Sequence, residues 1–348
     1  MIKVAIEVNN WKEKFLDKII VGNSIDILKK IPSEKIQLVI TSPPYYKQRK
    51  YSNLKDEIGN ERTVEEYIEN ILKVFHECVR IIKREGSIVF NLGDKYVDGG
   101  LLLVPYRFAL EVLKREPVKL VHNITWVKLN PTPRQYNRRL VSSTEPFFHF
   151  VKSDSYYINL DSFMSNLNEK RKKQKVTEKL GKRYFDLIEK APLTEEEKKK
   201  AIQELKRVIQ EVKDGKIEGF RMKIRGIHAP AFGGQEGGRK IQIEKQGFTI
   251  IRIHGKPIKR DVIECAVETL KGCPHPAVYP EFIIQEIIKL LTRPGDIVLD
   301  PFVGSGTTCV AAKKLGRHYI GIDINPEYCE YAEKRVKKIA SPLEYFIK

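Results

Sequence analysis

The sequence L-D-P-F-V-G-S-G-T-T occupies residues 299–308 and joins an apolar run to a helical pattern that begins at Thr307. A second apolar run, 318–324, follows that helix, so this segment predicts a βαβ unit. Gly304 and Gly306 allow the turn to approach a ligand closely, and the helix N-terminus offers unpaired N–H groups. The segment therefore indicates an α/β fold with a ligand-binding turn.

An acidic residue, Asp323, stands near the end of the second strand of this unit. A carboxylate at that place accepts hydrogen bonds from the two hydroxyls of a ribose, which predicts a ligand that contains a nucleoside. A dinucleotide is the alternative ligand. Its loop would have a third glycine where Cys309 stands, and Pro301-Phe302 directly after the strand does not match a pyrophosphate loop.

A second motif, L-V-I-T-S-P-P-Y-Y, occupies residues 38–46. Proline cannot donate to a sheet ladder and has a fixed φ, so Pro43 and Pro44 end the strand and stiffen the loop that follows. Ligands of open α/β sheets bind at the carboxyl ends of the strands, which is where we expect Ser42 and Tyr45. A strand ended by prolines, with tyrosines on the surface, is the alternative interpretation.

The composition restricts the partners and the compartment. The 348 residues carry a net charge of +18, which favours nucleic acid as a partner; association with ribosomes or with an anionic membrane surface is the alternative. No apolar run reaches the roughly 18 residues of a membrane span, and the N-terminus has no signal-peptide pattern. Five cysteines without a C-x-x-C pair predict reduced thiols, a cytoplasmic protein and no metal site.

The order of elements predicts two halves of one domain with an insertion between them. Strands and helices alternate over 1–152 and again over 273–348, which indicates a largely parallel sheet with helices on both faces. The predicted strands of the first half are 18–21, 36–40, 87–91 and about 122–128. One helix begins at a capping box of Thr63 and Glu66 and ends at Gly86, and another spans about 102–114.

Alternation stops over 153–272, where we expect an inserted domain with a core of its own. Residues 168–190 are rich in lysine and arginine, and a capped amphipathic helix spans 195–214. A glycine-rich stretch, 231–240, has the side chains to read base edges, with Arg239 suited to guanine and Gln235 to adenine. A surface loop is the alternative for that stretch. The basic run together with Arg134, Arg138 and Arg139 predicts contacts to phosphates.

Both motifs resemble those of the amino-methylating DNA methyltransferases. D-P-F-V-G-S-G-T-T is similar to the S-adenosylmethionine loop of this family, and T-S-P-P-Y is similar to its catalytic loop. Segments 59–96, 126–153 and 275–282 resemble further elements of the family. The catalytic loop precedes the cofactor loop, with an insertion between them, which is the circularly permuted order of the β class. Asn23 stands where many members have aspartate, and Tyr279 stands where phenylalanine is commoner.

The resemblance implies a Rossmann-like S-adenosylmethionine-dependent methyltransferase fold, circularly permuted, with an inserted DNA target-recognition domain over 153–272. It implies catalytic roles for Ser42, Pro43, Pro44 and Tyr45. It implies cofactor binding by Asn23, His275, Pro276, Asp300, Phe302, Gly304, Ser305, Gly306, Thr307 and Asp323. The implied partners are double-stranded DNA, a cognate restriction endonuclease and, in a homodimer, a second copy of the chain.

The target base follows from the same resemblance. Ser-Pro-Pro-Tyr is associated with N4-cytosine methylation in this family, and N6-adenine methylation is the alternative. The Ser42 hydroxyl and the Pro43 carbonyl would accept the two N–H groups of the amine, while Tyr45 would stack on the extruded base. C5-cytosine chemistry is excluded because the chain has no Pro-Cys pair. A nucleotide-dependent oxidoreductase and a non-catalytic DNA-binding protein are more distant alternatives.

Overall fold

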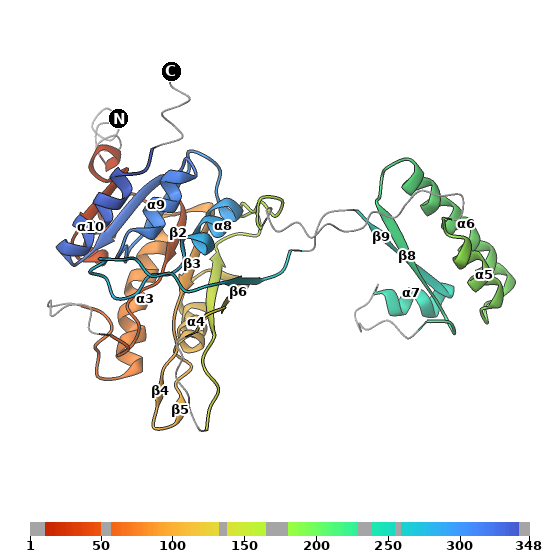
Figure 1. The fold of residues 1–348 in the computed structure, drawn as a ribbon, viewed down its shortest axis with the longest axis horizontal. Coiled ribbons are helices and arrows are strands. Elements are labelled where there is room, and N and C mark those ends of the chain that lie inside the picture. The colour runs from red at the N-terminus through yellow and green to blue at the C-terminus, as the bar shows by residue number, and fades with distance from the viewer. Residues whose placement is uncertain are drawn as a thin grey trace, which may run out of the picture. The chain divides into compact units, whose positions relative to one another are not determined.

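The computed structural model describes residues 11–49, 57–131, 138–164, 180–228, 238–254 and 259–340. The chain forms two compact units (Figure 1). One unit comprises Met1–Met164 together with Lys259–Lys348, and the other comprises Ser165–Ile258. No helix in the described ranges is long and apolar enough to cross a bilayer.

An eight-stranded sheet in the order β1-β12-β11-β2-β3-β7-β6-β10 forms the centre of the first unit. Its strands are β1 (Lys18–Val21), β2 (Ile36–Thr41), β3 (Ile82–Asn91), β6 (Lys119–Lys128), β7 (Thr144–Val151), β10 (Val262–Cys265), β11 (Ile297–Asp300) and β12 (His318–Asp323). Every pairing is parallel except those of β7, which is antiparallel to both of its neighbours. The sheet is therefore largely parallel, as predicted.

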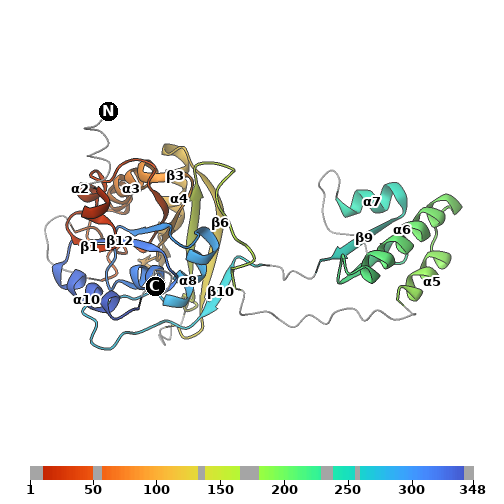
Figure 2. The ribbon, with the colours of Figure 1, turned by 90° about the horizontal axis from the view of Figure 1, so that it is seen from above.

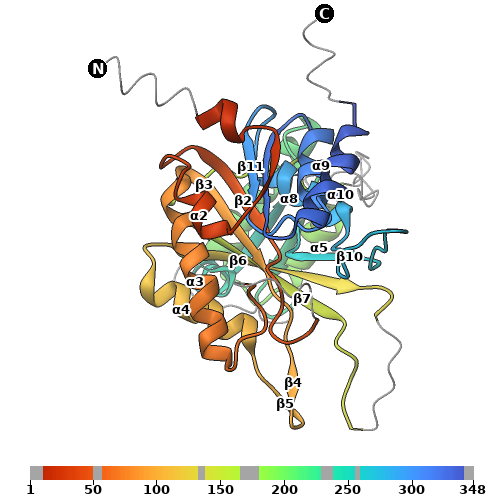
Figure 3. The same cartoon turned by 90° about the vertical axis from the view of Figure 1, so that its left-hand side faces the viewer.

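Helices cover both faces of this sheet. They are α2 (Ser24–Leu28), α3 (Val64–Ile81), α4 (Val104–Arg115), α8 (Glu281–Leu291), α9 (Thr307–Lys314) and α10 (Pro326–Lys337). Figure 3 shows α2, α3 and α4 on one side and α8, α9 and α10 on the other. Val39 of β2 belongs to the core on the first side, whereas its neighbours Leu38 and Ile40 belong to the core on the second. Such burial on both faces explains why this strand is a continuous apolar run.

The helix predicted to end at Gly86 ends five residues earlier, at Ile81, and Gly86 lies inside β3. The pairing of β2 and β3 is irregular here, and a Cβ at Gly86 would lie 2.8 Å from the Gln37 carbonyl oxygen. This glycine is therefore needed for close approach to the neighbouring strand. The capping box also differs, because the Glu66 carboxylate accepts the N–H of Arg62 instead of that of Thr63.

The second unit is built on the antiparallel pair β8 (Gly219–Ile224) and β9 (Phe248–Ile253). Its helices are α5 (Lys182–Lys190), α6 (Glu195–Lys213) and α7 (Arg239–Gln246). The first two cover one side of the strand pair, and α7 lies on the other (Figure 2). The strand pair, α5 and α6 enclose a separate apolar core, and α6 begins at the predicted capping box. The unit thus has a core of its own, as expected for an inserted domain.

This unit is shorter at both ends than the predicted insertion of 153–272. Residues 153–164 and 259–272 belong to the first unit. The reason is that β10 pairs with β6 of the large sheet, and the Asn159 N–H donates to the Leu290 carbonyl in α8. Arg134, Gln235 and residues 168–179 lie outside the described residues, as does most of the glycine-rich stretch.

Candidate active site

The turn between β11 and α9 is held open by two glycines in the left-handed region. Gly304 has a φ of +47°, and a Cβ there would lie 2.9 Å from Nε2 of His275. Gly306 has a φ of +84°, and its Cβ would lie 2.7 Å from the Ala332 side chain. Both positions therefore require glycine, for the conformation and for the close approach of neighbouring groups.

Asp323 closes this turn from the end of β12. Its carboxylate accepts the N–H of Gly304 and the N–H of Asn325, each at 2.9 Å. The pKa of this carboxyl is raised to about 6, chiefly by burial and to a smaller extent by the nearby Asp300 and Glu57, while the two N–H groups oppose the shift. The predicted ribose acceptor is thus also the group that fixes the glycine turn.

Asp300 lies beneath the turn and is fully buried. Its two carboxylate oxygens accept hydrogen bonds from the hydroxyls of Thr41, Thr308 and Tyr279, at 2.6, 2.6 and 3.0 Å, and from the Phe302 N–H at 3.0 Å. Burial raises the pKa of this carboxyl, whereas these donors lower it. Asp300 therefore connects the ends of β2 and β11, and its predicted contact with a cofactor stays a prediction.

Arg335 of α10 holds the other side of the turn, and no pattern in the sequence pointed to it. Its guanidinium donates to the Ser305 carbonyl at 2.7 Å and to the Thr307 hydroxyl at 3.1 Å. Both of these residues are buried. Because the guanidinium donates to the loop carbonyl, it fixes the backbone from which the loop N–H groups project.

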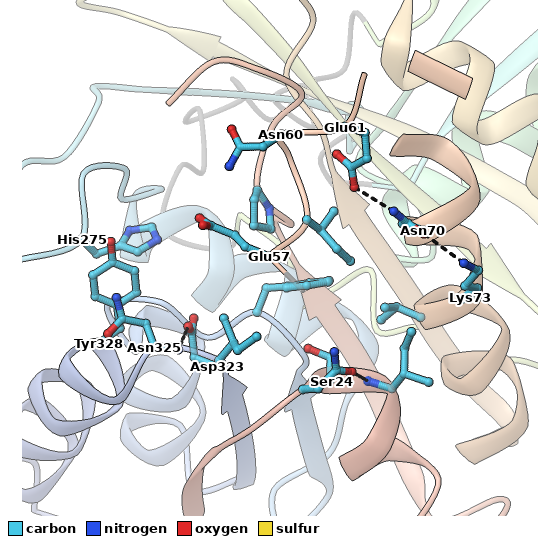
Figure 4. Close-up of a pocket in the computed structure, with 17 residues that line it drawn as sticks. Ser24, Glu57, Asn60, Glu61, Asn70, Lys73, His275, Asp323, Asn325 and Tyr328 are labelled. Carbon is cyan, nitrogen blue, oxygen red and sulfur yellow. Dashed lines mark hydrogen bonds between the residues drawn. The ribbon is translucent and has the colours of Figure 1, made fainter. Parts of the chain in front are cut away.

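A cavity of about 410 Å³ lies above the carboxyl ends of β1, β11 and β12 (Figure 4). This volume is within the range of ordinary ligand pockets. Asn23, Phe302, Asp323 and His275 line it, all of which were predicted to bind the cofactor. Asn23 caps α2 by accepting the Ile25 N–H at 2.9 Å, so an amide replaces the usual carboxylate without loss of the cap.

We refer to this first space as the donor cavity. Its lining is acidic although the protein is strongly basic. Among the described residues of the lining, Glu57, Glu61 and Asp323 face the cavity together with the cation Lys73. Glu61 accepts the Gly59 N–H and the Asn70 amide at 2.9 and 3.0 Å. An acidic lining fits a ligand that carries positive charge and disfavours a pyrophosphate. The loop 57–61 was not predicted to take part, because nothing in its composition distinguishes it from a surface loop.

A second cavity, of about 310 Å³, is lined by Ser42, Pro44 and Tyr45 of the proline loop. Its other walls come from segments far away in sequence, including Trp126, Lys128, Ser142, Glu145 and residues 267–269 and 275–279. Pro276, Gly304, Ser305 and Thr307 also line it. Pro43 is buried beneath the loop. We refer to this space as the acceptor cavity.

The Tyr45 hydroxyl is the centre of a hydrogen-bond network in the acceptor cavity. It accepts the Ser42 hydroxyl proton at 3.1 Å and lies 2.9 Å from Oε2 of Glu145 and 2.8 Å from Oδ1 of Asn91. A Cβ at Gly93 would lie 2.4 Å from the Tyr45 ring. The ring is therefore held at both its hydroxyl and its edge. Tyr46, by contrast, is a core side chain whose ring contacts Tyr67.

Sequence reasoning missed the groups that complete this network. The Lys128 ammonium forms an ion pair with Glu145 and lies 5.0 Å from the centre of the Trp126 ring. The Asn91 amide donates to the Pro146 carbonyl at 3.0 Å, which directs its oxygen towards Tyr45. The resemblance of segment 126–153 to an element of the family, which includes Trp126, Lys128 and Glu145, was the available signal. It implied no role for any of these residues.

The two cavities meet. Pro44, His275, Phe302 and Asp323 line both of them. Tyr67 donates to the Pro44 carbonyl at 2.7 Å, and burial lowers the pKa of His275 to about 4, so this imidazole is neutral at pH 7. The structure thus brings the predicted catalytic and cofactor residues together, with Asp300 and Gly306 just behind the walls. No group of three or more metal-binding side chains occurs in the described ranges.

Comparison with known proteins agrees with this arrangement. The family profile described as "DNA methylase", which covers N6 and N4 methylases, matches residues 36–334. The chain belongs to this family. It is 27% identical to the type II methyltransferase M.SfiI of Streptomyces fimbriatus over 88% of both chains. It is 27% identical to M.BglII of Bacillus subtilis, over 93% of this chain and 70% of the relative.

Solved structures confirm the predicted fold class of this DNA methylase. The cytosine-N4-specific PvuII DNA methyltransferase superposes with a TM-score of 0.56 at 17% identity, covering 94% of this chain and 90% of that one. The putative DNA modification methylase TTHA0409 of Thermus thermophilus, in complex with S-adenosylmethionine, gives 0.51 at 19% identity, covering 92% and 95%. These likenesses show the Rossmann-like methyltransferase fold, here with the proline loop before the glycine turn in the chain.

Proposed function

We propose that this DNA methylase transfers the methyl group of S-adenosylmethionine to the N4 amine of a cytosine extruded from duplex DNA. The observation that carries the proposal is the contact between an acidic donor cavity and an acceptor cavity, with Ser42 in the wall of the second. The donor is a sulfonium cation, which an acidic pocket attracts. The glycine turn closes the donor cavity at Asp323, whose carboxylate accepts the Gly304 N–H and lies in the wall.

The chain contributes orientation and polarity at the acceptor. An exocyclic amine is a weak nucleophile because its lone pair is delocalised into the ring, whereas the sulfonium methyl is strongly electrophilic. The Ser42 hydroxyl donates its hydrogen bond to the Tyr45 oxygen, so the lone pairs of the Ser42 oxygen are left to accept an N–H of the amine. The Pro43 carbonyl accepts the other N–H. Two acceptors on one amine localise its lone pair and direct it at the donor cavity.

Glu145 makes Ser42 a better acceptor by acting through Tyr45. Tyr45 donates to this carboxylate or to Asn91, and the bond it accepts from Ser42 is strengthened in turn. The ion pair with Lys128 keeps Glu145 in place. With its hydroxyl and its edge held, Tyr45 offers one ring face to a base, which supports the proposed stacking.

The choice of cytosine rests on the motif. Ser-Pro-Pro-Tyr is typical of N4-cytosine enzymes, and a serine hydroxyl at this position supplies an uncharged acceptor. The family profile covers both N4 and N6 methylation, so adenine is the competing base. The relatives named above are type II methyltransferases. We therefore also propose that the chain protects a specific site from a cognate endonuclease.

The second unit is the proposed target-recognition domain. Some of its described cations hold the unit together: Arg225 is paired with Glu197 of α6, and Arg252 with Glu204 and Glu211 of the same helix. Exposed cations on α5 and α7 are available to DNA, among them Lys182, Arg183, Arg239 and Lys240. Changing Lys182 and Arg183 to glutamine should reduce the slope of log affinity for DNA against log salt concentration by about two phosphate contacts. An unchanged slope would contradict the assignment.

One experiment tests the reaction and the base together. The purified protein is incubated with S-adenosylmethionine labelled in the methyl group and duplex DNA of mixed sequence, which is then digested to nucleosides. We expect labelled N4-methylcytosine. Labelled N6-methyladenine would overturn the choice of base and leave the reaction intact. An unlabelled digest would overturn the DNA methylation itself. Sequencing the labelled DNA gives the recognition site.

A further inference from the structure

Three exposed apolar side chains lie within two residues, along the chain, of Lys128 or Ser142 in the wall of the acceptor cavity. Leu129 follows β6 and is 63% exposed, while Leu140 and Val141 precede β7 and are 91% and 37% exposed. A single exposed leucine is ordinary on a protein surface. Three on the two ends of one connection, beside a reaction site, are not explained by folding, because none of them is buried by it.

Leu140 lies close to the acceptor cavity because residues near it in the chain form part of the cavity wall. Lys128 and Ser142 both line that cavity, and each is within two residues of the exposed group. Two residues of extended chain span at most about 7 Å, which is about two steps of a base stack. The Lys128 N–H donates to the Ser143 carbonyl at 2.8 Å, so the base of this connection is fixed to the sheet.

The segment that carries Leu140 is also held by a contact of Arg139 with a neighbouring hairpin. The guanidinium of Arg139 lies 4.3 Å from the centre of the Tyr96 ring, in the hairpin of β4 (Tyr96–Val97) and β5 (Gly100–Leu101). Figures 1 and 3 show this hairpin and the segment that leads to β7 projecting from the same edge of the sheet. Leu140 therefore stands on a supported projection, with the exposed cations Arg138 and Arg139 directly before it.

This combination of an apolar tip and flanking cations matches bent or opened duplex DNA. Arginines neutralise phosphates, and an apolar side chain enters between base steps, where it replaces lost stacking contacts. Extrusion of a base leaves such a gap in the duplex. A gap next to the acceptor cavity is within reach of Leu140, because the extruded base occupies the cavity that Ser142 lines.

We propose that Leu140 enters the base stack at the position that the target base leaves, and so stabilises the extruded state. This inference rests on the proposed DNA methylation. Leu140 acts as a positioning residue, since its effect on the methyl transfer passes through the population of extruded base. Arg138 contacts a flanking phosphate while the leucine is inserted, and Arg139 stays on Tyr96 and keeps the segment in place.

The test compares two duplexes that carry the recognition site found by sequencing, one fully paired and one with the target base mispaired. A mispaired base costs less to extrude and needs the leucine less. We expect Leu140→Ala to lower kcat/KM on the paired duplex about ten- to hundredfold. This is the effect of losing a leucine side chain that would be buried between bases in the complex. On the mispaired duplex the loss should fall to within about threefold. Leu140→Met should keep most of the activity on both.

Leu110→Ala is the matched control, because Leu110 is 58% exposed on the outer face of α4. It should leave both rates unchanged. Melting temperature and S-adenosylmethionine affinity, measured for each variant, separate misfolding from a defect in extrusion. Equal losses on the paired and mispaired duplexes, or no loss on either, would overturn the inference. Failure of the wild-type protein to label DNA would instead overturn the proposed function.

Discussion

The donor cavity and the acceptor cavity share four wall residues, yet they are built in different ways. The floor of the donor cavity is a single βαβ unit, in which a glycine turn and the acidic end of the next strand face each other. The acceptor cavity is assembled from the proline loop, the ends of β6 and β7, and the segment 267–279. The floor of the first is thus local in sequence, although Asn23, Glu57, Lys73 and His275 complete its walls, whereas every wall of the second depends on the folded sheet.

This difference explains why one site tolerates little change in its backbone and the other depends on side-chain contacts. In the donor cavity, positive φ values and close approach fix the positions of N–H groups. In the acceptor cavity, three side chains from different parts of the sheet edge, Ser42, Asn91 and Glu145, fix a single hydroxyl, that of Tyr45, and Lys128 in turn holds Glu145. Substitutions in the two cavities should therefore fail in separable ways, the first in affinity for the methyl donor and the second in rate.

The largest effect is expected at Ser42. Ser42→Ala removes one of the two proposed acceptors of the amine, so the rate of methyl transfer at saturating S-adenosylmethionine should fall about 10²–10³-fold. Affinity for the donor, measured by calorimetry without DNA, should stay unchanged. Ser155→Ala, at an exposed serine outside the cavities, is the control. A loss of donor affinity equal to the loss of rate would show that the two cavities are not separable.

Next in size is the effect of Gly93→Ala. This glycine has an ordinary φ, but its new Cβ would lie 2.4 Å from the Tyr45 ring, so the ring must move. A displacement of about 1 Å at a reacting site costs up to about 10²-fold in rate. The single-turnover rate should fall by that order while donor affinity holds. Gly100→Ala, whose Cβ meets its nearest atom at 3.6 Å, is the matched control. An unchanged rate would mean that Tyr45 does not contact the base.

The same contrast decides what the sequence could predict. Gly304, Gly306 and Asp323 were identified because the turn, the helix and the strand end that bear them are consecutive. Glu145 and Asn91 were missed because their meeting with Tyr45 depends on the antiparallel placement of β7 beside β3. Alternation of strands and helices predicts parallel neighbours and gives no sign of such a reversal.

Boundaries were misplaced for a related reason. Residues 259–272 lack helical or strand periodicity of their own, and β10 is a strand only because β6 offers it a free edge. Gly86 indicates a helix end in isolation, yet the irregular pairing with β2 needs it inside a strand. Both errors concern tertiary contacts that outweigh local preference.

In the donor cavity the main effect is on affinity. Gly304→Ala adds a Cβ 2.9 Å from the His275 ring at a φ of +47°. Either the turn or His275 must shift to relieve an overpacking of about 1–3 kcal/mol. Binding of S-adenosylmethionine to the unshifted turn would restore that strain, so the affinity should fall about ten- to hundredfold. Gly316→Ala has a φ of +70° but nothing within 4 Å, so it should lower the melting temperature and leave the affinity intact. Equal affinities for the two variants would show that the close approach at Gly304 is unimportant.

The smallest effect concerns pH. Burial raises the pKa of the Asp323 carboxyl to about 6. Ribose hydroxyls donate to the ionised carboxylate, so the affinity for S-adenosylmethionine should rise as the pH increases through 6 and level off above it. The affinity should be about twofold below its plateau at pH 6 and about tenfold below it at pH 5. Asp323→Asn should bind more weakly at pH 8 and show no such rise. An unchanged pH dependence in that variant would assign the titration to a group other than Asp323.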